Sequence, residues 1–410
     1  MNIFGIVTIA SIVIYLVVGF YSAKGLKTLD DFYVMGRNAP SFLITGTLIA
    51  TNISSIAFIG YVGAVYTRGS LPYISMFGAT IISALFLGLH MGRYIWRMKL
   101  YTMPDFFTIR YPNNETIKFF STAIVLFSMM VYLISVFQGV NVVLVNIFGF
   151  STVMAQIISI GVVTIFTVAG GMKGVVLTDT IMFVIFFFTA MLVAPYLLET
   201  LGGWPHGITA AAEKLPYAMT WNGTFTKFVG AWHYIEVNTA SVILVLSSPH
   251  LLSRTFIAKS EKVFGRSMVL QAVILPFFIF MLLFTFSWLG AVRPDIAPTS
   301  AFTYVATNIA PPLIGSIALA GILAAALSSA SSMFQQAAAA LSRDIYERYI
   351  KKDATNKQKL LVSRISVIII GITCFITGIV PEITTTGIVY GFFFATAGWA
   401  GWFPALLFGI

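Results

Sequence analysis

The sequence predicts an all-α polytopic membrane protein, and composition, apolar runs and the placement of basic residues all favour this fold class. Hydrophobic residues make up 58% of the chain and charged residues 9%, whereas about a quarter of the residues in a soluble domain are charged. The apolar residues fall into long runs, and about 20 such residues are enough for a helix to cross a bilayer. The single cysteine, Cys374, excludes an internal disulfide and a cysteine-cluster metal site.

We expect about eleven transmembrane helices in one transmembrane domain that covers residues 1–410. The first 23 residues carry no charged side chain, which favours a retained span over a cleaved signal peptide. The predicted spans lie near residues 3–23, 41–66, 72–92, 119–147, 151–170, 175–198, 229–250, 267–291, 311–341, 365–380 and 384–410.

Basic residues follow a strict alternation along the predicted connections. The odd-numbered connections hold 20 Lys and Arg residues, Arg254 among them, and the even-numbered ones hold four. Because basic residues collect on the cytoplasmic side, the N-terminus is expected outside and residue 410 at or near the cytoplasmic face. The net charge of +10 then reflects membrane topology, and nucleic acid is not an expected partner.

An odd number of spans per unit would invert the second unit relative to the first. If residues 1–40 form an extra first helix with its cytoplasmic connector, residues 41–198 and 227–410 each hold five spans. The second set then enters the membrane from the opposite side, which is the arrangement of an inverted repeat. This argument is topological, because the two halves show no clear repeat of residues.

Two spans carry polar clusters where a bilayer offers no hydrogen-bond partner. The stretch AAALSSASS (324–332) contains Ser328, Ser329, Ser331 and Ser332, and the second span has Thr51, Asn52, Ser54 and Ser55 at its midpoint. The serines either donate to carbonyls one turn earlier or bind an ion. The second span is either an intact helix that packs small polar residues, or a broken helix whose backbone lines a binding site.

Six motifs in the chain resemble the sodium:solute symporter family and occur in the family's order. They are DDFYVMGRN (30–38), TMPDFFTIRY (102–111), GGMKGVVLTD (170–179), SSPHLLSRTFIAKS (247–260), AAALSSASS (324–332) and LSRDIYERYIKK (341–352). The PHLLSR segment is closer to the proline, pantothenate and carboxylate branches than to the sugar branch. The resemblance implies a leucine-transporter-type fold: one extra N-terminal helix, then a five-plus-five inverted repeat with discontinuous second and seventh helices.

The resemblance also implies two sodium sites. The first would use the carbonyl groups of Ala50, Ile53 and Ala325 and the hydroxyls of Ser328 and Ser329. Neutral oxygen ligands suit a hard cation and would let it leave again. A second sodium, found in some family members, would use Asp179, Ser331 and Ser332. The alternative is that Asp179 lies at the cytoplasmic interface and caps a helix.

The substrate residues are less well defined by the resemblance. Asn52, Ser54 and Ser55 at the break are the main candidates, followed by Gln138 of the fourth span and Tyr390 of the eleventh. Ala57 stands where the sugar branch has its substrate glutamine, and this argues against a sugar.

The expected function is sodium-coupled symport of a small polar solute, most readily an amino acid or a carboxylate, by alternating access in the cell membrane. The expected partners are this solute, sodium and membrane lipid, with no obligate protein partner. The alternatives are a proton-coupled transporter and a symporter-like sensor without net transport. An enzyme is not expected, because the sequence has no recognisable nucleophile motif, acid–base pair or metal cluster.

Overall fold

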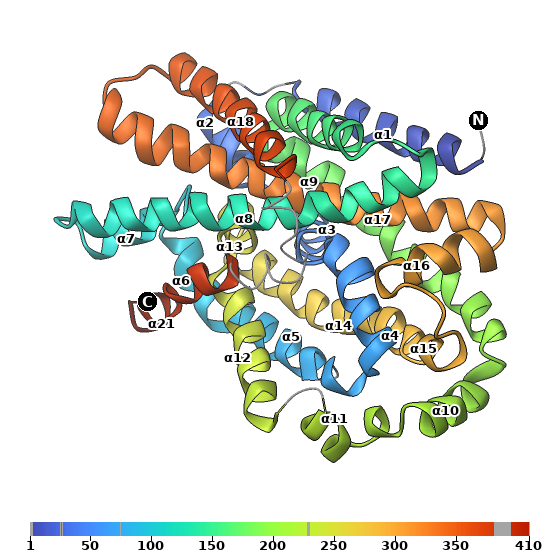
Figure 1. Cartoon of the computed structure of the whole chain (residues 1–410). Coiled ribbons are helices and arrows are strands. Elements are labelled where there is room, and N and C mark those ends of the chain that lie inside the picture. The colour runs from blue at the N-terminus through green and yellow to red at the C-terminus, as the bar shows by residue number, and fades with distance from the viewer. Residues whose placement is uncertain are drawn as a thin grey trace.

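Long helices that run side by side make up the fold (Figure 1). The computed structural model describes residues 3–24, 26, 28–73, 75–227, 230–380 and 395–409. Within these ranges the β-structure consists of an isolated bridge between Ala39 and Ala258. The prediction of an all-α protein is therefore confirmed.

The helices follow the predicted spans closely, with ends that differ by a few residues. Seven of the described helices are long and apolar enough to cross a membrane, and a bent pair makes an eighth. In chain order the helices that correspond to predicted spans are α1 (Ile3–Ser22), α3 (Ser41–Asn52) with η2 (Ile56–Tyr61) and α4 (Val62–Arg68), α5 (Ser75–Phe86) with η4 (Leu87–Met91) and α6 (Gly92–Arg97), α8 (Glu115–Phe148), α9 (Thr152–Thr200), α12 (Ala231–Ser247) with α13 (Pro249–Ile257), α14 (Glu261–Phe286), α17 (Pro312–Ala339) with η8 (Ala340–Ile350), α18 (Asn356–Gly378) and α21 (Phe403–Gly409). The predicted eleventh span, 384–410, is described only from residue 395 to residue 409.

Shorter helices connect the spans. Two of them, α2 (Leu29–Val34) and α7 (Pro104–Arg110), lie in the connectors before the second and fourth spans. The segment after α9 forms α10 (Gly203–Lys214), η5 (Pro216–Met219) and α11 (Trp221–Lys227), and α15 (Leu289–Val292), η6 (Pro298–Ser300), α16 (Ala301–Tyr304) and η7 (Val305–Ile309) lead to α17.

Both helices expected to be discontinuous are broken. The two halves of the second span meet at Ile53–Ser55 and are bent by 50°. The seventh span stops at Ser248, which has the extended angles φ −66° and ψ 118°, and restarts at Pro249 as α13. Proline suits a first helical position because its missing N–H would be unpaired there anyway.

The predicted fifth and sixth spans are joined by a kink in α9 where a loop was expected. Gly171 has φ 52° and ψ −151° inside this helix, a conformation open essentially to glycine alone. A Cβ atom at this position would lie 2.7 Å from the ring of Phe32. The kink therefore requires a residue without a side chain.

Helix α17 forms the centre of the bundle and packs against α9, α8, α1 and α18. In its most apolar stretch 83% of the residues are buried inside the molecule, against 28% for α1. A helix that is apolar on every side and surrounded by other helices has no lipid face. The four serines of AAALSSASS are thus in the interior of the protein.

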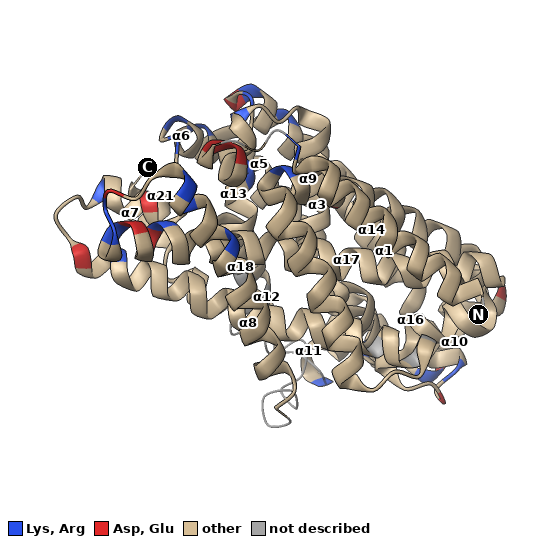
Figure 2. Cartoon of the chain, turned by 90° about the horizontal axis from the view of Figure 1, so that it is seen from above, with Lys and Arg blue, Asp and Glu red and all other residues tan. Residues whose placement is uncertain are grey.

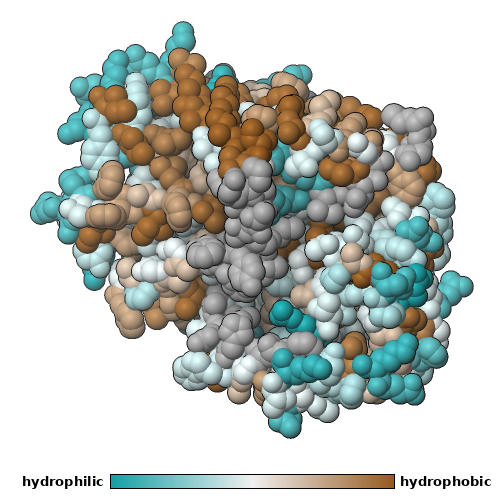
Figure 3. Space-filling model, viewed as in Figure 1, coloured by the Kyte–Doolittle hydropathy of each residue, from teal (hydrophilic) through white to brown (hydrophobic). Residues whose placement is uncertain are grey.

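Charged residues gather at the end of the bundle that carries α6, α7 and the C-terminal α21, while the N-terminus lies at the opposite end (Figure 2). Figure 3 shows hydrophobic residues between hydrophilic residues at two opposite edges of one face. This distribution is the one expected of a protein that spans a bilayer with its basic end on one side.

Replacement of Gly171 by alanine should destabilise the protein by about 1–3 kcal/mol, because a strained backbone and a clash with Phe32 would be combined. Gly161→Ala in the same helix is the matched control, since nothing lies within 4 Å of its added Cβ. We expect the melting temperature of the purified protein to fall for Gly171→Ala alone. Equal melting temperatures for the two variants would contradict this role of the kink.

Candidate functional site

The break in the second span creates the first element of the site. Ile53 leaves the helix with φ −97° and ψ 120°, so carbonyl groups of the last turn of α3 lose their intrahelical donors. After the break the Ser54 hydroxyl accepts a hydrogen bond of 3.2 Å from the backbone N–H of Ile56. Gly139 of α8 lets the second half approach closely, because a Cβ there would lie 2.3 Å from the hydroxyl oxygen of Ser55.

Two serines of α17 donate to the carbonyl groups that the break exposes. The Ser328 hydroxyl lies 2.8 Å from the carbonyl oxygen of Ala50 and 3.0 Å from that of Ala325. The Ser329 hydroxyl lies 3.2 Å from the carbonyl oxygens of both Thr51 and Ile53. The exposed fractions of both serines are 0%, so water does not share these contacts.

The structure thus brings together all five residues predicted for the first sodium site. Their oxygen atoms are neutral and buried, and they come from two helices, α3 and α17. The Thr51 carbonyl is a further oxygen at this position that the sequence did not single out. Such a set fits a hard monovalent cation, since the hydroxyls need only rotate their protons away and turn a lone pair toward an ion held among oxygen atoms already assembled.

Asp179 of α9 lies beside the next turn of α17, which carries Ser331 and Ser332, and is completely buried. One of its carboxylate oxygens accepts from Thr47 at 2.7 Å and from Ser332 at 3.2 Å, and the other accepts from Ser331 at 3.2 Å. The three residues predicted for a second sodium are therefore adjacent. Asp179 does not cap a helix at the membrane interface.

The guanidinium group of Arg254 on α13 already pairs with this carboxylate. Its Nη2 lies 3.0 Å from the Asp179 oxygen, and the exposed fractions of both side chains are 0%. The topology count placed Arg254 in a cytoplasmic loop, and this placement was wrong. All nine residues of α13 are buried. The only sequence signal of this burial is the apolar residues around Arg254 in PHLLSRTFI.

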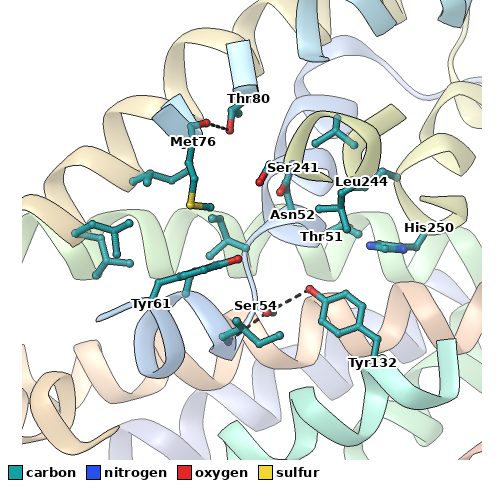
Figure 4. Close-up of a pocket in the computed structure, with 18 residues that line it drawn as sticks. Thr51, Asn52, Ser54, Tyr61, Met76, Thr80, Tyr132, Ser241, Leu244 and His250 are labelled. Carbon is teal, nitrogen blue, oxygen red and sulfur yellow. Dashed lines mark hydrogen bonds between the residues drawn. The ribbon is translucent and has the colours of Figure 1, made fainter. Parts of the chain in front are cut away.

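A cavity with about 800 Å³ of empty space, part of it open to solvent, adjoins the break. Residues 51–54 form one wall, and the others come from η2, α5, α8, α12, α13 and α14 (Figure 4). Polar groups line it at Thr51, Asn52, Ser54, Tyr61, Thr80, Tyr132, Ser241 and His250. No Lys, Arg, Asp or Glu is among the described residues that line this cavity.

The predicted substrate residues separate into two groups. Asn52 and Ser54 line the cavity, and the Nδ2 of Asn52 has no hydrogen-bond partner in the described part of the chain. Ser55 points to α8, where its hydroxyl donates to the Val136 carbonyl at 3.0 Å. Gln138 is half-buried on α8 and is not among the described lining residues. Tyr390 lies outside the described residues.

The sequence did not indicate the aromatic end of the cavity. His250 and Tyr132 line it, and their ring centroids are 5.9 Å apart. The ring of Trp399 lies 5.1 Å from His250 and 5.9 Å from Tyr132. These residues come from three distant segments and have no common motif, so only the fold brings them together.

Residues of three motifs converge with Tyr101 at the charged end of the bundle. Arg37 donates to the carbonyl groups of Lys99, Leu100 and Phe256 at 2.8–3.1 Å. The ring of Tyr101 lies between Arg37 and Arg343, whose guanidinium carbons are 4.9 Å and 4.0 Å from its centroid. Burial and a hydrogen bond to Asp30 raise the pKa of Tyr101. This layer ties the connectors to α13 and η8.

Comparisons with known proteins agree with this geometry. The sodium/proline symporter of Escherichia coli is 24% identical over 96% of this chain and 80% of its own length. The sodium/sialic acid symporter SiaT of Proteus mirabilis is 24% identical over 87% of this chain and 74% of its own length. The solved structure of a Na+-coupled sialic acid symporter superimposes with a TM-score of 0.86, at 20% identity, over all of this chain and 87% of its own.

That structural similarity confirms the predicted leucine-transporter-type fold. The family description "Sodium:solute symporter family" matches residues 32–410, which is nearly the whole chain. The protein belongs to the sodium:solute symporter family and is a sodium-coupled symporter of small solutes in the membrane.

Proposed function

We propose that the solute of this symporter is a small zwitterionic amino acid, and that sodium binds between α3 and α17. The observation that carries the proposal is the set of neutral oxygen atoms at the break, contributed by Ala50, Ile53, Ala325, Ser328 and Ser329. The same short segment, residues 51–54, lines the solute cavity. An ion bound at the break would therefore lie next to the solute.

Coupling follows from this shared segment. Sodium that joins Ala50 and Ile53 to Ser328 and Ser329 would hold the two helices together and fix residues 51–54 in a solute-competent arrangement. By linkage, the solute must then favour sodium binding by the same free energy. An inside-negative membrane potential adds about 2.3 kcal/mol per charge for each 100 mV to the ion gradient.

The lining of the cavity favours a zwitterion over a net anion. Because no described lining residue carries a fixed positive charge, a second carboxylate on the solute would be desolvated without a partner. A single carboxylate has two partners available: the bound sodium and the unpaired amide Nδ2 of Asn52. The apolar remainder, with Ile279, Leu282 and Leu283, suits a compact hydrocarbon side chain.

The orientation in the membrane is part of the proposal. Charged residues gather at the end with α6, α7 and α21 (Figure 2). Even without Arg254, basic residues in the odd-numbered connections far outnumber those in the even-numbered ones. We infer that this end faces the cytoplasm and that the N-terminus and α10 face outward.

Ser328→Ala and Ser329→Ala should each raise the sodium concentration for half-maximal solute uptake about ten-fold. A ligand lost to a cation costs about 1.5–3 kcal/mol, and 1.4 kcal/mol is a factor of ten. The measurement is uptake of radiolabelled proline, alanine or another amino acid found to bind, in proteoliposomes at varied sodium.

Ser316→Ala is the matched control for these variants. Ser316 is also buried in α17, but its hydroxyl donates to the Pro312 carbonyl one turn earlier. Its half-maximal sodium concentration should equal that of the wild type. Equal values for all three variants would remove Ser328 and Ser329 from the ion site. Uptake driven by a pH gradient without sodium would overturn sodium coupling itself.

Thermal-shift measurements should separate zwitterions from anions. In sodium buffer, neutral amino acids are expected to raise the melting temperature of the purified protein, whereas dicarboxylates and sialic acid should not. In potassium buffer neither class of solute should raise it. Asn52→Leu should abolish the shift, because it removes the free amide donor. Gln138→Leu, an amide outside the described lining, should keep it. Stabilisation by dicarboxylates would contradict the zwitterion assignment.

Cysteine labelling tests the orientation. The native Cys374 is buried, so a membrane-impermeant maleimide should leave the wild type unlabelled. Glu213→Cys on α10 and Lys352→Cys after η8 place a thiol at exposed positions of the two ends. In intact cells only Glu213→Cys should react, and Lys352→Cys should react after lysis. The reverse pattern would invert the topology.

A further inference from the structure

The buried carboxylate of Asp179 requires a positive charge, because an uncompensated charge in a membrane protein interior is very costly. Three elements surround it: α3 through Thr47 and Thr51, α17 through Ser331 and Ser332, and α13 through Arg254. Hydroxyl groups can orient a carboxylate but do not neutralise it. The carboxylate therefore needs a cation beside it unless it takes up a proton.

Arg254 supplies this cation, and all three of its guanidinium nitrogens form hydrogen bonds at the site. Nη1 donates to the His250 carbonyl at 2.8 Å and to the Ser253 hydroxyl at 3.0 Å, and Nε donates to Thr47 at 3.1 Å. Nη2 contacts Asp179 at 3.0 Å. An arginine does not lose its proton in proteins, so the positive charge is permanent.

The guanidinium contacts two of the three residues that a second sodium would use, Asp179 and Ser332. Its Nη2 donates to the hydroxyls of Thr51, at 2.8 Å, and Ser332, and to the carboxylate oxygen that also accepts from Ser332. Two cations at one carboxylate oxygen in a dry interior would repel each other strongly. The hydroxyl lone pairs of Thr51 and Ser332 are also engaged by the guanidinium.

We propose that Arg254 is the permanent cation of the Asp179 site, so that the transporter binds a single sodium ion, between α3 and α17, in each cycle. This inference rests on the proposed first sodium site, and it replaces the expectation of a second sodium at Asp179, Ser331 and Ser332. The arginine holds α3, α9, α13 and α17 together throughout the cycle, whereas the sodium at the break comes and goes.

Equilibrium binding of ²²Na⁺ to the purified protein tests the proposal. The wild type should bind one sodium per chain, and Ser328→Ala with Ser329→Ala should abolish this binding at the same sodium concentration. Arg254→Gln removes the positive charge and leaves the carboxylate free, so its binding should rise to two per chain. Arg254→Lys keeps a cation and should stay at one.

The double variant Asp179→Asn with Arg254→Gln controls for failure to fold. It removes both charges together, leaves no unpaired buried charge, and should bind one sodium. Two sodium ions per chain in the wild type, with one of them lost in Asp179→Asn, would overturn the proposal while leaving the first site intact. No sodium bound to the wild type would overturn both this inference and the proposed function.

Discussion

The structure depends on one constraint: a helix that breaks in the middle of a membrane must find new partners for its exposed carbonyl groups. In this protein the break at Ile53–Ser55 is satisfied by Ser328 and Ser329 of α17, the most buried of the described helices that are long and apolar enough to cross a membrane. The partners are hydroxyl groups. A cation can replace their hydrogen bonds to the carbonyls, and these bonds can re-form when it leaves. A satisfied break of this kind is stable without the ion and still able to bind it.

The composition of α17 follows from the same constraint. Backbone carbonyls of α3 reach the serine hydroxyls only if the two helices approach closely, and alanine at positions 324–326 and 330 allows this. Small residues serve this purpose in membrane helix packing generally. Two turns earlier in α17, Gly321 faces Thr189 of α9 with no room for a Cβ, because one would lie 2.2 Å from the threonine hydroxyl. The alanine-rich run is therefore a packing surface as well as a carrier of ligands.

Sequence reasoning succeeded where local chemistry decides and failed where tertiary contacts decide. Hydroxyls inside apolar runs need partners whatever the fold, so Ser328 and Ser329 stood out from the residues alone, whereas the break in the second span was predicted by the resemblance to the family. Arg254 was not, because an arginine near the end of a span resembles a cytoplasmic loop residue until its burial against Asp179 is known. Tyr132, His250 and Trp399 come from separate helices, and no periodicity links them. Ser55 illustrates the converse, since a polar residue at a break can face a neighbouring helix.

The two cations have different mechanical consequences. The guanidinium of Arg254 is covalently tethered to α13 and bonds to α3, α9 and α17, so its contacts can rearrange only if these elements separate. The sodium proposed at the break is held by α3 and α17 alone and can leave without moving α9 or α13. Thr51 belongs to both arrangements, through its carbonyl at the break and its hydroxyl at the arginine, and it also lines the cavity. Loss of sodium would thus affect the solute cavity through Thr51, whose hydroxyl stays bonded to Arg254. This confines the movement to residues 52–54 and the second half of the broken helix.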